Sequence, residues 1–223
     1  GPPRHVSLPG HGRDDQRGSG DCGTIHRPAV IHASIFYSAA LRIRTMRPPI
    51  HNVRMNSVLR DYLQSHEIQP KDNSPAIWRA IERLTFPGNL RLSAWSRFDL
   101  SDRTNLVLGS LGYMSYTHSP THRFRTGAFC SIAAGVTIMG DSHPSERVST
   151  HPFTYGPYYR NAAKAMGAER TIMSVPFDGR QPETIVGDDV WIGARVTMAG
   201  GLKIGTGAIL ATAAVVTRDV PPY

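Results

Sequence analysis

A six-residue repeat in the C-terminal part of the chain constrains its fold more than any other feature. The period matches neither the 3.6-residue turn of an α-helix nor the two-residue alternation of a β-strand. It fits a unit of one short strand and one turn, and three such units close a triangular coil whose aliphatic side chains point inward and stack. Those side chains recur without interruption through six units: Val186, Ile192, Met198, Ile204, Leu210 and Val216.

Two other positions of each unit support the stacked coil. The fifth position is apolar and mostly of modest size, and the second is Gly or Ala in five of the six units and Thr217 in the last. Small residues allow a corner to turn tightly. Burial of one aliphatic side chain contributes roughly 1.5 to 3 kcal/mol, so a single coil is marginal and the stack is expected to fold cooperatively.

A weaker copy of the repeat precedes this block, at residues 126–131 and 132–137, and it places Cys130 at a small inward position. Between the two copies lies a non-repeating stretch, 140–183, which is rich in His, Pro, Tyr and Arg. We interpret it as one long excursion loop. A loop of this length inside a repeat domain is more often functional than idle.

The N-terminal half has a different character. Residues 1–54 show no sustained period and predict a disordered or irregular leader, with a weak helical segment at 31–43. Residues 55–105 predict a helical or irregular extension, with two short helices between Asn56 and Leu84 separated by the polar turn 69–74. The repeat domain is expected to occupy residues 106–223.

Composition narrows the function classes. The 223 residues carry a formal charge of +8, but nine Arg and only three acids lie in residues 1–60, so the main body is nearly balanced and we expect no nucleic-acid partner. No apolar run approaches the roughly 20 residues that span a bilayer, and the N-terminal segment 1–20 lacks the apolar stretch of a signal peptide. We therefore expect no membrane association and a cytoplasmic protein. The two cysteines form neither a disulfide framework nor a zinc pattern.

Three stretches of the repeat, 185–194, 204–211 and 214–223, resemble the hexapeptide-repeat acetyltransferases, whose fold is a left-handed parallel β-helix. Residues 127–132 and the loop that holds His143 and the segment 150–153 are similar to the xenobiotic branch, which acts on chloramphenicol, streptogramins and sugars of surface polysaccharides. The resemblance covers about residues 106–223. It implies a mainly β fold with left-handed crossovers, against the usual preference, and a C-terminal tail that this sequence lacks.

The resemblance implies an O-acetyltransferase that moves an acetyl group from acetyl-CoA to a hydroxyl of a small acceptor, with His143 as general base. An alcohol is a poor nucleophile, and an imidazole can remove its proton during direct attack on the thioester. Asp141 or Glu146 could hold the second ring nitrogen, and we prefer Glu146. Cys130 is the less favoured alternative, as a covalent nucleophile.

The family's binding sites suggest further residues. His151, Tyr155 and Tyr158 could line the acceptor pocket, or could instead pack the loop against a neighbouring subunit. The expected CoA contacts lie along the coil edges, where Arg218 could meet a phosphate. These contacts are Trp191, Ala194, Thr212, Thr217 and Arg218.

The resemblance also implies a homotrimer, because each active site of the family lies between two subunits, and it implies no metal. A γ-type carbonic anhydrase with a zinc ion on three histidines is a rival on the same fold, but residues 186–223 contain no histidine. A non-catalytic scaffold is the third alternative. The acceptor stays open between an antibiotic and a sugar or polysaccharide precursor, and we lean towards the sugar.

Overall fold

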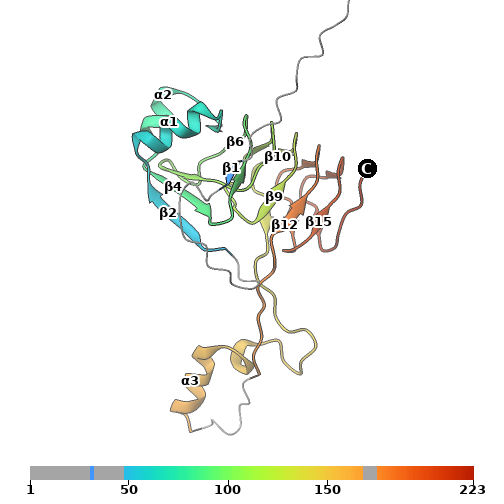
Figure 1. Cartoon of the computed structure of the whole chain (residues 1–223). Coiled ribbons are helices and arrows are strands. Elements are labelled where there is room, and N and C mark those ends of the chain that lie inside the picture. The colour runs from blue at the N-terminus through green and yellow to red at the C-terminus, as the bar shows by residue number, and fades with distance from the viewer. Residues whose placement is uncertain (1–30, 33–47, 168–174) are drawn as a thin grey trace, which may run out of the picture.

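The main body of the chain is a left-handed parallel β-helix (Figure 1), as the repeat and the resemblance predicted. The computed structural model describes residues 31–32, 48–167 and 175–223. In the C-terminal coils each strand pairs in parallel with the strand of the third repeat unit after it, as Trp191 does with Ile209 and Thr197 with Val215. Three hexapeptides therefore make one coil.

Short strands stack into three faces. The first face contains β3 (Gln69–Pro70), β6 (Arg97–Phe98), β8 (Tyr116–Thr117), β10 (Ser131–Ile132), β13 (Trp191–Ile192) and β16 (Ile209–Leu210). The second contains β11 (Thr137–Ile138), β14 (Thr197–Met198) and β17 (Val215–Val216). The third contains β9 (Phe124–Thr126), β12 (Thr184–Val186) and β15 (Lys203–Ile204).

Two small sheets complete the N-terminal end. β2 (Ile50–Arg54) pairs antiparallel with β4 (Arg83–Pro87), which pairs in parallel with β7 (Asn105–Val107). β1 (Ile31–His32) pairs antiparallel with β5 (Arg91–Leu92).

The corners explain the repeat. The fourth position of the first five units has a left-handed backbone: φ is +54° at Asp189, +56° at Arg195, +77° at Gly201, +75° at Gly207 and +61° at Ala213. At the second position the next coil leaves no room, because a Cβ on Gly193 would lie 2.6 Å from the backbone nitrogen of Thr212. The close coil spacing thus favours a small residue at the second position, whereas the left-handed turn at the fourth position also accepts Asp189 and Arg195.

The inward side chains form one continuous core. Ile132, Val186, Ile192, Met198 and Ile204 are all at most 2% exposed. Cys130 is fully buried in the same cluster, at the small inward position that the weaker repeat predicted. Because every coil buries its aliphatic residues against the coils above and below, stability is shared along the stack.

Two helices cover the N-terminal end of the stack, as the sequence predicted: α1 (Ser57–Ser65) and α2 (Pro75–Ala80) (Figure 1). The side chains of Asn56 and Ser74 accept hydrogen bonds from backbone amides of the respective first turns. Leu63 and Trp78 are buried in the same core as the coils. The helices therefore cap the prism and shield its apolar end.

Parallel pairing runs across the expected boundary at residue 106, since β3, β6 and β8 belong to the same face as the later coils. Arg97 pairs with Tyr116, and Tyr116 pairs in turn with Ser131. These two coils differ in length from each other and from the three-hexapeptide coils that follow. For this reason no hexapeptide pattern marks them in the sequence.

The expectation of irregular structure through residue 54 is wrong at its end, because β2 is a regular strand there. A strand of alternating exposed and half-buried residues pairs with β4 along its whole length. Of the helical segment expected at 31–43, Ile31–His32 is a strand. The other residues of that segment and of the leader up to 47 lie outside the described residues.

The excursion leaves the β-helix between β11 and β12 as an arm that points away from the stack (Figure 1). Its neck is a pair of antiparallel segments, in which Ser142 N donates to Gly179 O at 2.7 Å and Gln181 N to Gly140 O at 3.0 Å. The expectation of a loop without regular elements needs correction, because the arm holds the 3-10 turn η2 (Pro152–Thr154) and the helix α3 (Pro157–Ala165). Pro157 at the first helical position and the alanines that follow favour this helix.

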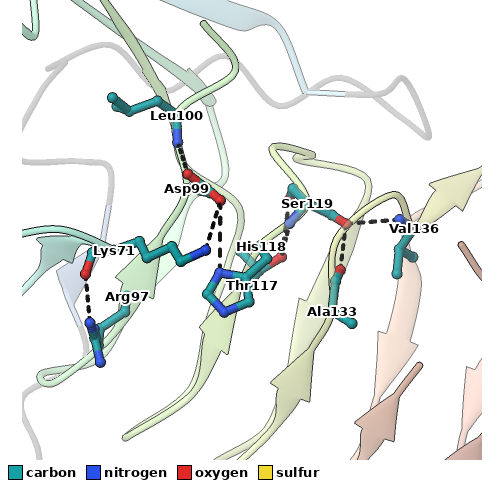
Figure 2. Close-up of polar contacts among 9 residues, drawn as sticks. All are labelled: Lys71, Arg97, Asp99, Leu100, Thr117, His118, Ser119, Ala133 and Val136. Carbon is teal, nitrogen blue, oxygen red and sulfur yellow. Dashed lines mark hydrogen bonds and ion pairs between the residues drawn. The ribbon is translucent and has the colours of Figure 1, made fainter. Parts of the chain in front are cut away.

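Ser119 lies beside Ala133 and Val136, at the corner that precedes β11 of the second face (Figure 2). Ser119 Oγ donates to Ala133 O at 2.7 Å and accepts from Val136 N at 2.8 Å. These bonds satisfy the corner of the coil above, which has no strand beneath it on this face among the described residues. Beside Ser119, His118 Nδ1 lies 3.8 Å from Asp99 Oδ2, beyond hydrogen-bond distance.

In the part of the chain that the structure describes, no helix has the length and apolar character needed to cross a bilayer.

Candidate active site

His143 stands at the root of the arm, on the corner where the second face passes into the third. Its Nδ1 lies 3.1 Å from the carbonyl oxygen of Thr150 and 2.8 Å from the hydroxyl of Tyr155. A carbonyl can only accept, so the contact with Thr150 favours a proton on Nδ1. The neutral ring then carries its free lone pair on Nε2, which suits it to accept a proton from a bound molecule.

The partners of His143 differ from those that we expected. Glu146 is exposed, and the groups that face Nδ1 are the oxygens of Thr150 and Tyr155 rather than a carboxylate. The sequence offers little indication of these two contacts, because Thr150 uses its backbone carbonyl and Tyr155 lies further along the chain, in the turn before α3. The catalytic role of Glu146 stays a prediction.

The three residues expected at the acceptor pocket make different contacts. Tyr155 reaches His143, whereas His151 caps η2, with its Nδ1 accepting from Phe153 N at 3.1 Å. The ring of His151 also packs on Tyr159, at 4.8 Å between centroids. Tyr158, on the first turn of α3, is 74% exposed. The arm thus uses His151 for its own packing and leaves Tyr158 open.

The residues expected to contact CoA flank the second face. Ala194 and Thr212 lie at its corner with the first face, one coil apart, where Ala213 N donates to Ala194 O at 2.8 Å. Thr217 and Arg218 directly follow β17, at the corner with the third face from which the arm also departs. Thr212, Thr217 and Arg218 are exposed.

Trp191 is separate from this group. It lies on β13 of the first face, between Ser131 and Ile209 in neighbouring strands, and is 56% exposed. Four of the five expected cofactor residues therefore border one face of a single chain, and Trp191 belongs to the adjacent one.

A cavity of about 640 Å³ opens at the neck of the arm, towards β2 and β4. His122, Arg123, Arg180 and Glu183 give it polar walls, and Ile50 and Pro87 line its other side. Glu183 is paired with Arg125 at 3.0 Å, but burial outweighs this cation and raises the pKa of the carboxyl. His143 is not among the residues that line the cavity.

Cys130 is in no position for nucleophilic chemistry. Its Sγ lies 3.1 Å from the carbonyl oxygen of Gly187 inside the core, and burial raises the pKa of the thiol above its ordinary value. The thiolate is the reactive form. In residues 48–167 and 175–223, no group of three or more His, Cys, Asp or Glu side chains could hold a metal ion.

Several known proteins with similar sequences are acetyltransferases. The chain is 32% identical over 142 residues to a chloramphenicol acetyltransferase of Agrobacterium fabrum, a match that covers 53% of this chain and 61% of the relative. It is 38% identical over 100 residues to a probable macrolide acetyltransferase of Lysinibacillus sphaericus, covering 44% of this chain and 51% of the relative. No family model matches the chain.

A shorter match reaches the bifunctional protein GlmU of Caldanaerobacter subterraneus, with 40% identity over 50 residues, 22% of this chain and 11% of the relative. The chain spans about half the length of the curated acetyltransferases that it matches. Together with the fold, these matches confirm the resemblance to hexapeptide-repeat acetyltransferases of the xenobiotic branch.

Proposed function

Starting from this kinship with hexapeptide-repeat acetyltransferases, we propose that the chain is an O-acetyltransferase that transfers the acetyl group of acetyl-CoA to a hydroxyl of a small acceptor. The observation that carries the proposal is the imidazole of His143, exposed at the root of the arm with two oxygens on Nδ1. That arrangement leaves Nε2 free to act as general base.

In the proposed reaction, Nε2 of His143 removes the hydroxyl proton as the acceptor oxygen attacks the thioester carbonyl carbon. The resulting tetrahedral species collapses with cleavage of the carbon–sulfur bond, and the imidazolium gives the proton to the departing thiolate of CoA. The oxygens of Thr150 and Tyr155 would stabilise the imidazolium between the two steps. Direct transfer needs no acyl-enzyme, in keeping with the burial of Cys130.

Acetyl-CoA is proposed to lie along the second face, which is bordered by Ala194, Thr212, Thr217 and Arg218. The arm that carries His143 starts from the same corner of the coil as Thr217 and Arg218, so the cofactor would end near the imidazole. Arg218 is exposed and is proposed to pair with a CoA phosphate. Trp191 would then contact the cofactor of an adjoining subunit. Tyr158 and His151 are proposed to meet the acceptor, and Glu146 to assist His143.

A homotrimer is supported by an apolar stripe on the first face and its leading corner. The stripe is built from large side chains that are each more than a third exposed in the single chain. Monomeric proteins rarely leave a broad apolar surface open to water. Its members are Trp95, Met114, Tyr116, Phe129, Trp191 and Ile209.

We propose a sugar or polysaccharide precursor as acceptor, with chloramphenicol-type or macrolide antibiotics as the competing class, since relatives are named for the latter. We place the reaction in the cytoplasm, because acetyl-CoA is its co-substrate.

The test is thiol release from acetyl-CoA with a panel of amino sugars, nucleotide sugars, chloramphenicol, a macrolide and a streptogramin. We expect release that depends on one acceptor class, and that class identifies the substrate. Failure of the protein to bind CoA or to release thiol with every acceptor would overturn the proposal and favour a non-catalytic scaffold.

A further inference from the structure

The two sides of the arm are joined by Arg147, a half-buried residue on its outgoing segment. Its Nη1 donates to Val175 O and its Nη2 to Pro176 O, each at 2.9 Å. The two carbonyls are consecutive along the returning segment, so the planar fork of the guanidinium grips both at once. Within the part of the chain that the structure describes, this cation contacts carbonyls and rings rather than carboxylates.

Two aromatic rings complete this clasp, which we define as Arg147, Tyr155 and Phe177. The guanidinium carbon lies 5.4 Å from the ring centroid of Phe177 and 6.0 Å from that of Tyr155. The two rings meet edge to face, 5.2 Å apart. Cation–π and edge-to-face contacts have preferred geometries, so they favour one position of the Tyr155 ring.

The clasp contacts the imidazole of His143 through Tyr155. The hydroxyl of Tyr155 lies 2.8 Å from Nδ1 of His143, while the ring of Tyr155 packs on Phe177 and Arg147. The position of the hydroxyl therefore depends on the hydrogen bonds of Arg147 to Val175 and Pro176 on the returning segment.

We propose that Arg147 is a positioning residue, which acts through Tyr155 to hold the His143 ring in the orientation in which Nδ1 faces the Thr150 carbonyl and carries the proton. The inference rests on the proposed role of His143 as general base. Tyr155 is thereby a positioning residue as well, in place of the acceptor contact expected from the sequence. Neither residue needs to touch the substrate.

The test compares four variants. Arg147→Lys keeps the charge but cannot grip two carbonyls in one plane. Tyr155→Phe keeps the ring in the clasp and removes only the hydroxyl. Arg160→Lys, an exposed arginine on α3, is the matched control, and His143→Gln assigns the signal.

The first readout is the side-chain nitrogen NMR spectrum of histidine-labelled protein without substrates. We expect wild type and Arg160→Lys to show His143 with the proton on Nδ1, and Arg147→Lys and Tyr155→Phe to show a mixture of both tautomers. An unchanged His143 tautomer in Arg147→Lys would overturn the proposal, and the measurement needs no enzymatic activity.

The second readout is kinetic. Misorientation of a catalytic group costs about 10²-fold, so kcat should fall by up to this factor in Arg147→Lys and Tyr155→Phe, with the KM for acceptor within about twofold. A rise in acceptor KM at unchanged kcat would restore Tyr155 as an acceptor contact and contradict the proposal. If wild type transfers no acetyl group while the tautomer result holds, the proposed function fails and the positioning role stands.

Discussion

At the scale of single residues, Cys130 has a structural role in the core and no role in the proposed chemistry. Burial raises the pKa of its thiol, and the thiolate that reacts with disulfide reagents is correspondingly scarce. In a Cys22→Ser background we expect no reaction with a thiol reagent near pH 8 until the protein is unfolded. Cys130→Ala should retain acetyl transfer within about threefold, because the thiol takes no part in it. Rapid labelling of the folded protein would show that the core is open at this coil.

Protonation of His118 is expected to make the folded protein less stable in acid. Burial lowers the pKa of its imidazole, helped by Lys71 and Arg97 and opposed by Asp99. The folded protein thus binds this proton less readily than the unfolded chain, so stability is lost as pH falls from the unfolded value of about 6.5 through the lower folded value. We expect the fall in Tm between pH 7 and pH 5 to be smaller in His118→Gln than in wild type. Equal slopes in the two proteins would refute this.

At the scale of elements, the left-handed corners are the most demanding positions of the coil. Gly201 has φ +77°, and a Cβ there would lie 2.7 Å from the ring of Pro182. Left-handed backbone costs a residue with a Cβ roughly 1 to 2 kcal/mol. Gly201→Ala should therefore lower Tm by about 3 to 8 °C in thermal unfolding.

Gly135 is the matched control for this substitution. Its φ is +75°, but the nearest atom to an added Cβ is the flexible side chain of Arg195, at 3.1 Å. Gly135→Ala should destabilise less than Gly201→Ala, because the side chain of Arg195 can shift more easily than the ring of Pro182. A larger effect at Gly135 would contradict the account of the corner.

The elements also show what sequence reasoning can reach. The period from Val186 to Val216 predicted the coils, because stacked coils require one inward aliphatic residue in every six. The sequence did not predict the earlier coils around Tyr116. The number of residues from Arg97 to Tyr116 differs from that between Tyr116 and Ser131, so these coils have no fixed period.

The site was predictable only in part, for a related reason. His143 was predicted as the general base from its motif, whereas its contacts depend on how the arm folds back on itself. Thr150 contributes a backbone oxygen, while Arg147 and Tyr155, which precede α3 in the sequence, meet Phe177, which follows it. No local pattern encodes such contacts.

At the scale of the whole molecule, the apolar stripe of the first face predicts assembly. We expect a sedimentation mass of three chains. Phe129→Asp should dissociate the trimer, because it places a charge in the proposed interface, and its backbone at φ +60° is of a kind that Asp tolerates.

Val58→Asp is the control, since Val58 is 74% exposed on α1 at the capped end. It should leave the sedimentation mass unchanged. A wild-type monomer, or a trimer indifferent to Phe129→Asp, would remove the first face as the interface.

The most direct measurement of the central claim is acetyl transfer by wild type and His143→Ala, with the best acceptor found in the panel and with CoA binding measured alongside. General-base catalysis contributes about 10²- to 10⁴-fold, so kcat/KM should fall by this factor while the affinity for CoA stays within about twofold. Transfer by His143→Ala at the wild-type rate would contradict the claim that this imidazole activates the acceptor.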